Sequence, residues 1–192
     1  MARRILYLID SLGLGGAEGG LALTLRLLDR SRFEPEVAFL WEPAALAPRI
    51  RALGVPVHRV GARKGLRAIL AIPRIRRLLR AGRFDAVHTQ VQWASIDGRV
   101  AGRLAGVKVI SHVVNAENGE FRDSELGPWI SLKARMVAWL DRVTGRFFVD
   151  RFVAISEAVR ARPIRGESWD RFKFAVVHRG HDVEALLAES AL

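Results

Sequence analysis

A glycine-rich segment over residues 10–20 of this 192-residue chain has the composition best suited to binding a charged ligand. It reads Asp-Ser-Leu-Gly-Leu-Gly-Gly-Ala-Glu-Gly-Gly and follows an apolar run, residues 4–9, that predicts a buried strand. Glycines without a Cβ let the backbone approach a phosphate, and the free N–H groups of a following helix attract its charge. The segment therefore predicts either a phosphate-binding turn or a tight strand-to-helix connection without a ligand.

Other kinds of site are absent from the sequence. The dinucleotide fingerprint G-x-G-x-x-G fails, because Glu18 stands at the third glycine position when the pattern starts at Gly13 and Gly15. No serine lies in a G-x-S-x-G elbow, and the lack of cysteine excludes disulfides, thiolate zinc sites and cysteine nucleophiles. His58, His178 and His181 have no metal-ligand spacing with acidic partners, so we expect no metal and no cofactor.

The glycine segment sits in a regular alternation of strands and helices. Because the strands are continuously apolar, the pattern predicts a parallel sheet covered on both faces, a doubly wound Rossmann-like α/β domain. Ligands of such sheets bind beyond the carboxyl ends of the strands. The expected strands are residues 4–9, 36–41, 55–60, 85–88, 107–113, 151–155 and 174–177. The expected helices are residues 18–28, 46–53, 65–81, 94–105 and 129–148, one starting at 156, and one at 183–187.

The net charge of +11 comes from one stretch of the chain. Between Glu42 and Asp85 there are basic residues and no acidic ones, and elsewhere the two kinds match in number. Within this stretch the arginines surround a narrow apolar stripe at helical spacing. The pattern allows a solvated surface helix or attraction to an anionic membrane, whereas nucleic acid is disfavoured because no aromatic residues are interleaved. The arginines concerned are Arg74, Arg76, Arg77 and Arg80.

No apolar run approaches the length of a membrane-spanning helix, and Asp10 interrupts the first apolar run too early for a signal peptide. We therefore expect a cytoplasmic protein that rests on the inner face of the plasma membrane if the arginines bind lipid.

Six segments, in order along nearly the whole chain, resemble the amino-terminal domain of family 4 retaining glycosyltransferases of the GT-B fold. They are residues 4–9 with 15–18, then 53–57, 84–88, 98–107, 153–159 and 176–182. The resemblance implies two Rossmann-like domains with the active site between them, the first holding the acceptor and the second the nucleotide-sugar. We expect residues 1–180 to be the first domain and residues 181–192 the start of the crossing, with the donor domain absent.

The resemblance also implies roles for individual residues. The loop of Gly13, Gly15, Gly16 and Ala17 would lie against the donor diphosphate. Relatives place a histidine or arginine near the donor at the position of Val114. His112 lies two residues earlier, on the same face of the strand, and is therefore a candidate to replace that residue in catalysis. The residues expected at the acceptor or in the cleft, each with an alternative structural explanation, are His88, Gln90, Trp93, Asn115, Glu117 and Ser156.

The function implied is transfer of a sugar, with retention, from a nucleoside-diphosphate sugar to a lipid-linked or polysaccharide acceptor. We expect the chain to be inactive alone. The alternative is a non-catalytic binding subunit, or a membrane-docking partner, of a separate donor-domain chain.

Overall fold

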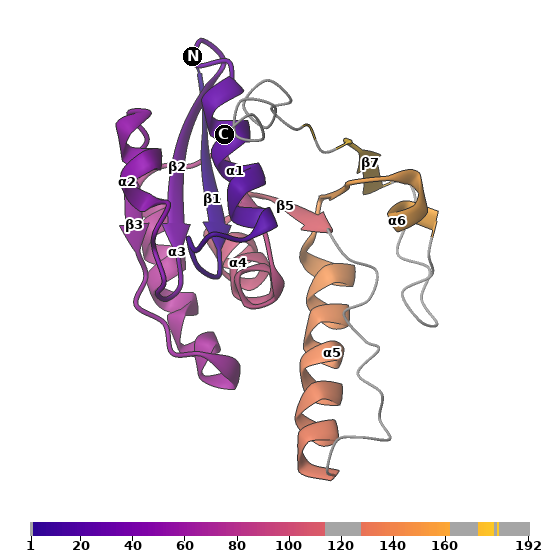
Figure 1. Cartoon of the computed structure of the whole chain (residues 1–192). Coiled ribbons are helices and arrows are strands. Elements are labelled where there is room, and N and C mark those ends of the chain that lie inside the picture. The colour runs from indigo at the N-terminus through magenta and orange to yellow at the C-terminus, as the bar shows by residue number, and fades with distance from the viewer. Residues whose placement is uncertain (1, 114–127, 162–172, 179, 181–192) are drawn as a thin grey trace, which may run out of the picture.

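The computed structural model describes residues 2–113, 128–161, 173–178 and 180, with the backbone alone for residues 128–131. These residues form a seven-stranded sheet in the order β3-β2-β1-β4-β5-β6-β7 (Figure 1). Every strand pair is parallel. The strands are β1 (Arg3–Ile9), β2 (Phe33–Phe39), β3 (Val57–Arg59), β4 (Ala86–Thr89), β5 (Lys108–Val113), β6 (Arg151–Ala154) and β7 (Phe174–Val176).

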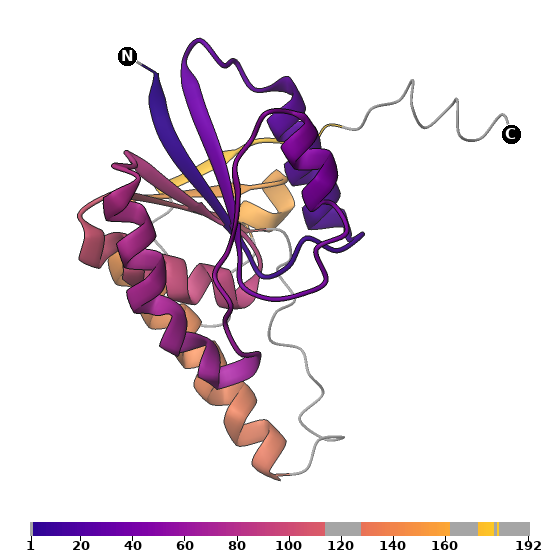
Figure 2. The same cartoon turned by 90° about the vertical axis from the view of Figure 1, so that its left-hand side faces the viewer.

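Helices connect successive strands and cover both faces of the sheet. Figure 2 shows α1 and α2 on one side of the strands and α3, α4 and α5 on the other. None of the helices among the described residues is long and apolar enough to cross a bilayer. They are α1 (Gly16–Leu27), α2 (Ala47–Ala52), η1 (Gly65–Ala71), α3 (Ile72–Ala81), α4 (Gln92–Ala105), α5 (Pro128–Phe148) and α6 (Glu157–Ala161), of which η1 is a 3₁₀ helix.

The doubly wound parallel sheet predicted from the sequence is confirmed, with shifts at the element ends. The helix expected over residues 65–81 divides into η1 and α3, and Pro73 lies in the first turn of α3, where its missing N–H leaves no helix hydrogen bond unmade. β2 begins earlier than expected and contains Pro35. A proline is tolerated there because β3 pairs only with residues 37–39 of β2, which leaves the outer side of Pro35 unpaired. The helix expected at residues 183–187 lies outside the described residues.

The core divides between the two faces of the sheet because side chains alternate along each strand. Leu6 and Leu8 of β1 pack with α3 and α4, whereas Tyr7 and Ile9 pack with α1 and α2. Each β1 residue named here is buried. β1 is therefore an interior strand on which both layers of helices rest.

Two glycines bring α4 unusually close to the sheet. A Cβ on Gly98 would lie 2.5 Å from Cγ2 of Thr89 and 2.7 Å from Cδ2 of Leu8. A Cβ on Gly102 would lie 2.8 Å from Cγ2 of Val109 and Cγ1 of Val87. The spacing of four residues places both glycines on one side of α4, so this face of the helix has no room for a larger side chain.

Arg99 joins α4 to β5 and α5. Its guanidinium is buried and donates hydrogen bonds to Oγ of Ser111 at 2.9 and 3.1 Å. It also donates to Oδ1 of Asp141 at 2.7 Å and to Oγ1 of Thr144 at 3.3 Å. One cation thus positions α5 against the rest of the domain.

We expect Arg99→Met to lower the free energy of unfolding by about 2 kcal/mol, because Asp141 and Ser111 lose a charged hydrogen-bond partner in a largely buried site. Urea denaturation measures the change. Arg103→Met, an exposed arginine on the same helix, is the matched control and should change the free energy by less than about 0.5 kcal/mol. Equal stability of the two variants would show that the Arg99 network does not hold α5.

Candidate functional site at the switch between β1 and β4

The winding of the sheet reverses between β1 and β4. The chain leaves β1 toward β2 on one side and leaves β4 toward β5 on the other. In doubly wound sheets the crevice outside the carboxyl ends of these strands is where ligands bind. Two connections border it here, residues 10–15 before α1 and residues 90–91 before α4. We call these connections and the helix ends that follow them the switch-point site.

The glycine loop has a buried part and an exposed part. Leu12 is buried and anchored through its backbone, since its N–H donates to the Pro43 carbonyl and its carbonyl accepts from Leu46, both at 2.9 Å. Gly13 is buried beside Pro43. Gly15 and Gly16 are exposed where α1 begins. Of the predicted loop residues, Gly15 and Gly16 therefore offer their amides to a ligand, Gly13 is enclosed, and Ala17 is half-buried.

Glu18 places a carboxylate at the start of α1. Its Oε2 lies so close to Gly15 that any Cβ there would collide with it. Oε1 accepts a hydrogen bond of 3.3 Å from Oγ of Ser11. A carboxylate in the first turn of a helix is favourable because it faces the positive end of the helix dipole. The N-terminus of α1 therefore already faces a negative charge of the chain itself.

The carboxylate of Asp10 likewise faces the N-terminus of α4. Its Oδ1 accepts the N–H of Ala94 at 2.6 Å and its Oδ2 that of Trp93 at 3.4 Å. The carboxylate is buried, and burial raises its pKa to about 6 despite these hydrogen bonds, with a further contribution from Glu18. Asp10 thus ties the end of β1 to the first turn of α4 across the switch point.

Asp97 is a second buried carboxylate, one turn further along α4. Its side chain is 0% exposed, and neither oxygen has a hydrogen-bond partner among the described residues. Burial, together with a smaller contribution from the charge of Asp10, raises the pKa of this carboxyl to about 7. Near neutral pH, Asp97 therefore binds a proton more readily than Asp10 does.

Three functional candidates were not predicted from the sequence: Asp10, Glu18 and Asp97. Asp10 carried a usable signal, because it directly follows the first buried strand of a doubly wound sheet. Asp97 lies between Ala94 and Ala101 at helical spacing, on the side of α4 that turns inward. Its closeness to Asp10 depends on the pairing of β1 with β4, which no local pattern reveals.

The structure brings His88 and His112 together on the face of the sheet that also carries Tyr7. The rings of His88 and His112 stack with centroids 5.7 Å apart, and that of Tyr7 lies 5.2 Å from His88. Burial, together with a smaller contribution from the charge of His112, lowers the pKa of His88 to about 3. His88 is therefore neutral at physiological pH, and its Nε2 is shielded from solvent, so an acceptor reaches it only if neighbouring atoms move.

The remaining predicted cleft residues are more dispersed. Gln90 is buried, and its N–H continues the ladder to the Leu8 carbonyl at 2.8 Å. Trp93 is half-buried and packs against the core under α4. Ser156 caps the short helix α6, accepting the N–H of Val159 at 3.2 Å. Asn115 and Glu117 lie outside the described residues.

The arginines of α3 are largely engaged with the protein. Arg74 donates to the Gly61 carbonyl at 3.2 Å, and Arg76 and Arg80 donate to that of Leu104 at 3.1 and 3.3 Å. Arg77 is exposed. These contacts fasten α3 to α4 and to the loop that follows β3, so the arginines do more than solvate a surface. The described residues contain no group of three or more metal-ligating side chains that could hold an ion.

The family model described as "Glycosyl transferase 4-like domain" matches residues 15–180, from the glycine loop to beyond β7. The chain belongs to this family. The match of the family model confirms the resemblance that the six sequence segments indicated. No curated protein sequence matches the chain.

Solved structures share the fold at low sequence identity. HepE from Anabaena, crystallised in complex with UDP, aligns with a TM-score of 0.69 and 16% identity over 94% of this chain and 45% of its own. A glycosyltransferase from Rickettsia africae aligns with a TM-score of 0.65 and 13% identity, over 95% and 44%. MurG from Acinetobacter baumannii aligns with a TM-score of 0.55 and 17% identity, over 93% and 46%. The chain thus spans about half the length of these GT-B structures.

We expect Asp97→Asn to raise the free energy of unfolding at pH 8 by roughly 2 kcal/mol and to change it little at pH 4. The carboxyl titrates near 3.8 when exposed and at about 7 in the fold, so the folded chain binds more protons between these values. Stability from this group is therefore present at low pH and lost as the pH rises to about 7. Thermal or urea denaturation at each pH gives the measurement.

Wild type and variant are compared at each pH, because His88 acts in the opposite sense. Its lowered pKa makes the fold lose stability as the pH falls below 6.5. Glu34→Gln removes one carboxylate from the exposed surface and controls for net charge. If Asp97→Asn is destabilising at pH 8, the buried carboxylate has a partner that the described residues do not provide.

Proposed function

We propose that this domain is the acceptor-side half of a glycosyltransferase that moves a sugar, with retention, from a nucleoside-diphosphate sugar to a lipid-linked or polysaccharide acceptor. The observation that carries the proposal is the pair of exposed amides at Gly15 and Gly16, which open α1 beside the switch point of the sheet. HepE, with the same fold, was crystallised with UDP, with UDP and glucose, and with UDP-glucose. The donor proposed here is a substrate, and no cofactor is invoked.

The glycine loop would act on the leaving group. As the glycosidic bond to the diphosphate breaks, negative charge grows on the phosphate oxygens. Backbone N–H groups at a helix N-terminus stabilise such charge where it develops, because they are already oriented toward it. Glu18 would control access to these amides, since its carboxylate must turn away from Gly15 before a diphosphate can take its place. Ser11, which now donates to Glu18, would be released to the phosphate.

The acceptor would bind along the carboxyl edge next to this loop. Trp93 and Gln90 lie at the start of α4, and His88 and His112 lie in the neighbouring strands. A neutral His88 cannot serve as a general acid, and its place in the proposal is a hydrogen bond to an acceptor hydroxyl through Nε2. His112 remains the candidate for a catalytic contact, and Asn115, Glu117 and Ser156 remain predictions.

The other half of the site would come from a donor-binding domain. The chain spans under half of the HepE, Rickettsia and MurG chains, and the amides of the glycine loop supply only one wall. We therefore propose that the chain turns over sugar only together with a donor domain, in one polypeptide or as a separate chain. In the second case it would be a binding subunit, recognised by a stable hetero-complex with activity only when both chains are present.

Calorimetric titration of the chain with UDP tests the half-site directly. We expect weak binding, with a dissociation constant well above micromolar, and amide NMR shifts concentrated at Gly15 and Gly16. The glycine loop, residues 10–20, contains no basic residue, so its attraction for a phosphate rests on the dipoles of the backbone amides alone. The titration therefore needs UDP at millimolar concentration. Sub-micromolar affinity would contradict the proposal, because it would mean that the chain forms a complete nucleotide pocket. Shifts that avoid the loop would contradict it as well.

Glu18→Gln should tighten UDP binding by about fivefold, because it removes a like charge worth about 1 kcal/mol from the helix N-terminus. Glu34→Gln, on the exposed surface of β2, removes the same charge far from the loop and should leave the affinity unchanged. Weaker binding by Glu18→Gln would show that the glutamate holds the loop open rather than closing it.

A further inference from the structure

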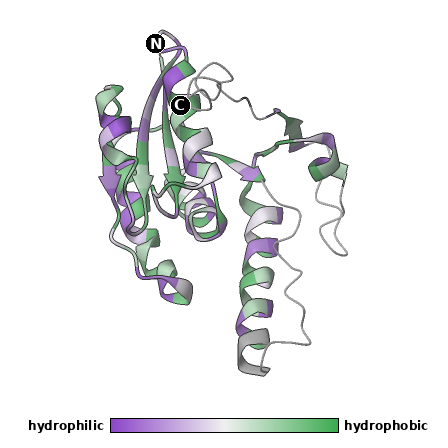
Figure 3. Cartoon of the chain, in the orientation of Figure 1, coloured by the Kyte–Doolittle hydropathy of each residue, from purple (hydrophilic) through white to green (hydrophobic). Residues whose placement is uncertain are grey.

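The outward face of α5 carries a stripe of large apolar side chains. Leu132 is 58% exposed, Met136 41%, Trp139 57% and Phe147 63%. A helix turns by about 100° per residue, so these positions fall within one narrow sector. Asp141, which binds Arg99 of α4, lies on the other side of the helix. The stripe therefore faces away from the domain, and Figure 3 shows its hydrophobic residues interleaved with hydrophilic ones along α5.

A second exposed apolar group lies on η1 and is surrounded by arginines. Leu70 is 67% exposed and Ile69 42%. Beside them a cavity of about 130 Å³ is lined by Arg63, Arg67 and Arg74. Three arginines beside a small cavity are suited to a phosphate, which accepts several charged hydrogen bonds at once.

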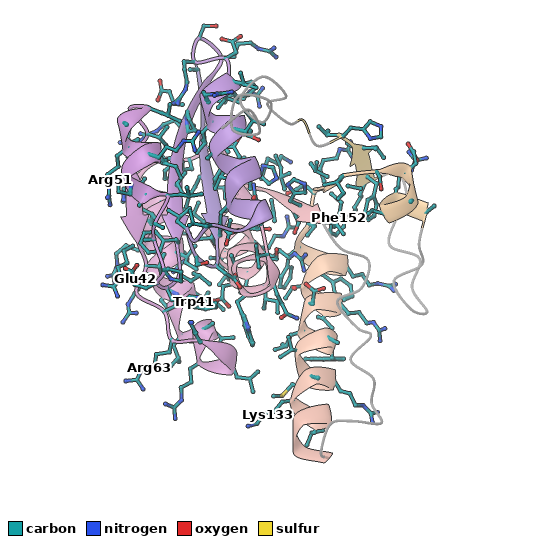
Figure 4. The ribbon with its side chains drawn as sticks, viewed as in Figure 1. Trp41, Glu42, Arg51, Arg63, Lys133 and Phe152 are labelled. Atoms are coloured by element: carbon teal, nitrogen blue, oxygen red, sulfur yellow. The ribbon has the colours of Figure 1, made fainter. Side chains whose placement is uncertain are left out.

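Both groups lie at the carboxyl edge of the sheet. A helix that connects parallel strands runs back against them, so η1 and α5 both begin at the edge where the strands end. In Figure 4, Arg63 and Lys133 lie toward the same end of the molecule, and Figure 1 shows α5 extending well beyond the sheet in that direction. Residues 60–81 and 132–140 contain basic residues and no acidic one.

We define the carboxyl-edge patch by its apolar residues Ile69, Leu70, Leu132, Met136 and Trp139 and its basic residues Arg63, Lys64, Arg67, Lys133 and Arg135. We propose that this patch docks the domain on an anionic phospholipid bilayer. The apolar side chains would enter the boundary between headgroups and acyl chains, and the long cations at the rim would reach the headgroup phosphates. The Arg63–Arg67–Arg74 cavity would hold one of these phosphates.

The charge of the patch favours this occupant over a protein surface. An amphipathic helix that lies in the membrane interface combines exposed Leu and Trp with Lys and Arg, as α5 does. Basic residues near an anionic bilayer each add to the affinity of a protein for it, and the two segments that supply the patch, residues 60–81 and 132–140, contain no acidic residue. We thus assign the membrane contact to η1 and α5, whereas the sequence predicted it on α3. The reason for the change is that Arg76 and Arg80 of α3 are bound to the Leu104 carbonyl.

The position of the carboxyl-edge patch also narrows the class of sugar acceptor. The patch and the glycine loop share one edge of the sheet, so a docked domain would present its switch point to molecules anchored in the membrane. The acceptor would then be lipid-linked rather than a free polysaccharide, an assignment that rests on the proposed function. The docking itself does not, since it requires neither nucleotide nor donor domain.

Co-sedimentation with vesicles tests the docking. The chain is mixed with vesicles of phosphatidylcholine alone or of phosphatidylcholine with phosphatidylglycerol, over a series of salt concentrations. We expect binding to the anionic vesicles that is at least about tenfold tighter than to the neutral ones and that weakens with salt. Equal retention on both vesicle types, or no retention on either, would overturn the proposal.

Two pairs of variants locate the contact. The triple variant Leu132→Gln, Met136→Gln, Trp139→Gln should lose binding, whereas Leu27→Gln, an equally exposed leucine on α1, should keep it. Arg67→Gln with Lys133→Gln should bind about tenfold more weakly, whereas Arg49→Gln with Arg51→Gln removes the same charge from α2 and should not. All these positions are exposed, and circular dichroism confirms that each variant is folded. Binding of the triple variant at the wild-type level would overturn the proposal.

A spectroscopic readout separates insertion from surface attraction. Brominated lipids quench tryptophans that enter the acyl region, so wild-type fluorescence should fall on binding, and Trp139→Phe should abolish most of that quenching. If the triple variant instead dissolves a concentration-dependent dimer while vesicle binding is unchanged, the patch is an interface between copies of the chain and the membrane proposal is wrong. Loss of UDP binding with vesicle binding intact would count against the proposed function alone.

Discussion

The hydrogen bonds from the amides of Ala94 and Trp93 to Asp10 are the interaction on which the switch-point site depends. They join the end of β1, which starts one winding of the sheet, to the first turn of α4, which starts the other. Val91 connects β4 to α4 with φ of +67°, a left-handed conformation that a β-branched residue adopts only at a cost. It is retained because the backbone is held on one side by the Gln90–Leu8 hydrogen bond and on the other by Asp10.

Both helices at the switch point begin against a carboxylate of the chain itself, but the two carboxylates differ in accessibility. Asp10 is buried and bound to two amides, so it is part of the framework. Glu18 lies at an exposed loop and has a hydroxyl partner, so it can exchange with another anion at little cost. The electrostatics of this edge therefore assign different tasks to two similar helix ends. α4 is fixed in place, whereas α1 is open to exchange.

Much of the fold could be predicted because its signals are local. Continuous apolar runs identified the parallel strands, Pro73 marked the first turn of α3, and Gly106 in a left-handed conformation ends α4. The site was less predictable because its contacts join distant segments. Asp97 meets Asp10 only through the pairing of β1 with β4, and Arg76 meets the Leu104 carbonyl across two helices. The apolar residues of α5 predicted a helix correctly, but their pattern did not say that the stripe would face outward.

The two outermost of the seven described strands, β3 and β7, are only three residues long. Unpaired backbone at the border of a sheet invites pairing with another chain, and such short strands offer little of it. The short edge strands thereby protect the domain from edge-to-edge pairing with the sheet of another molecule. Among the described residues, helices and loops therefore offer more surface for association than the strand borders do, and recognition there rests on side-chain chemistry instead of main-chain pairing.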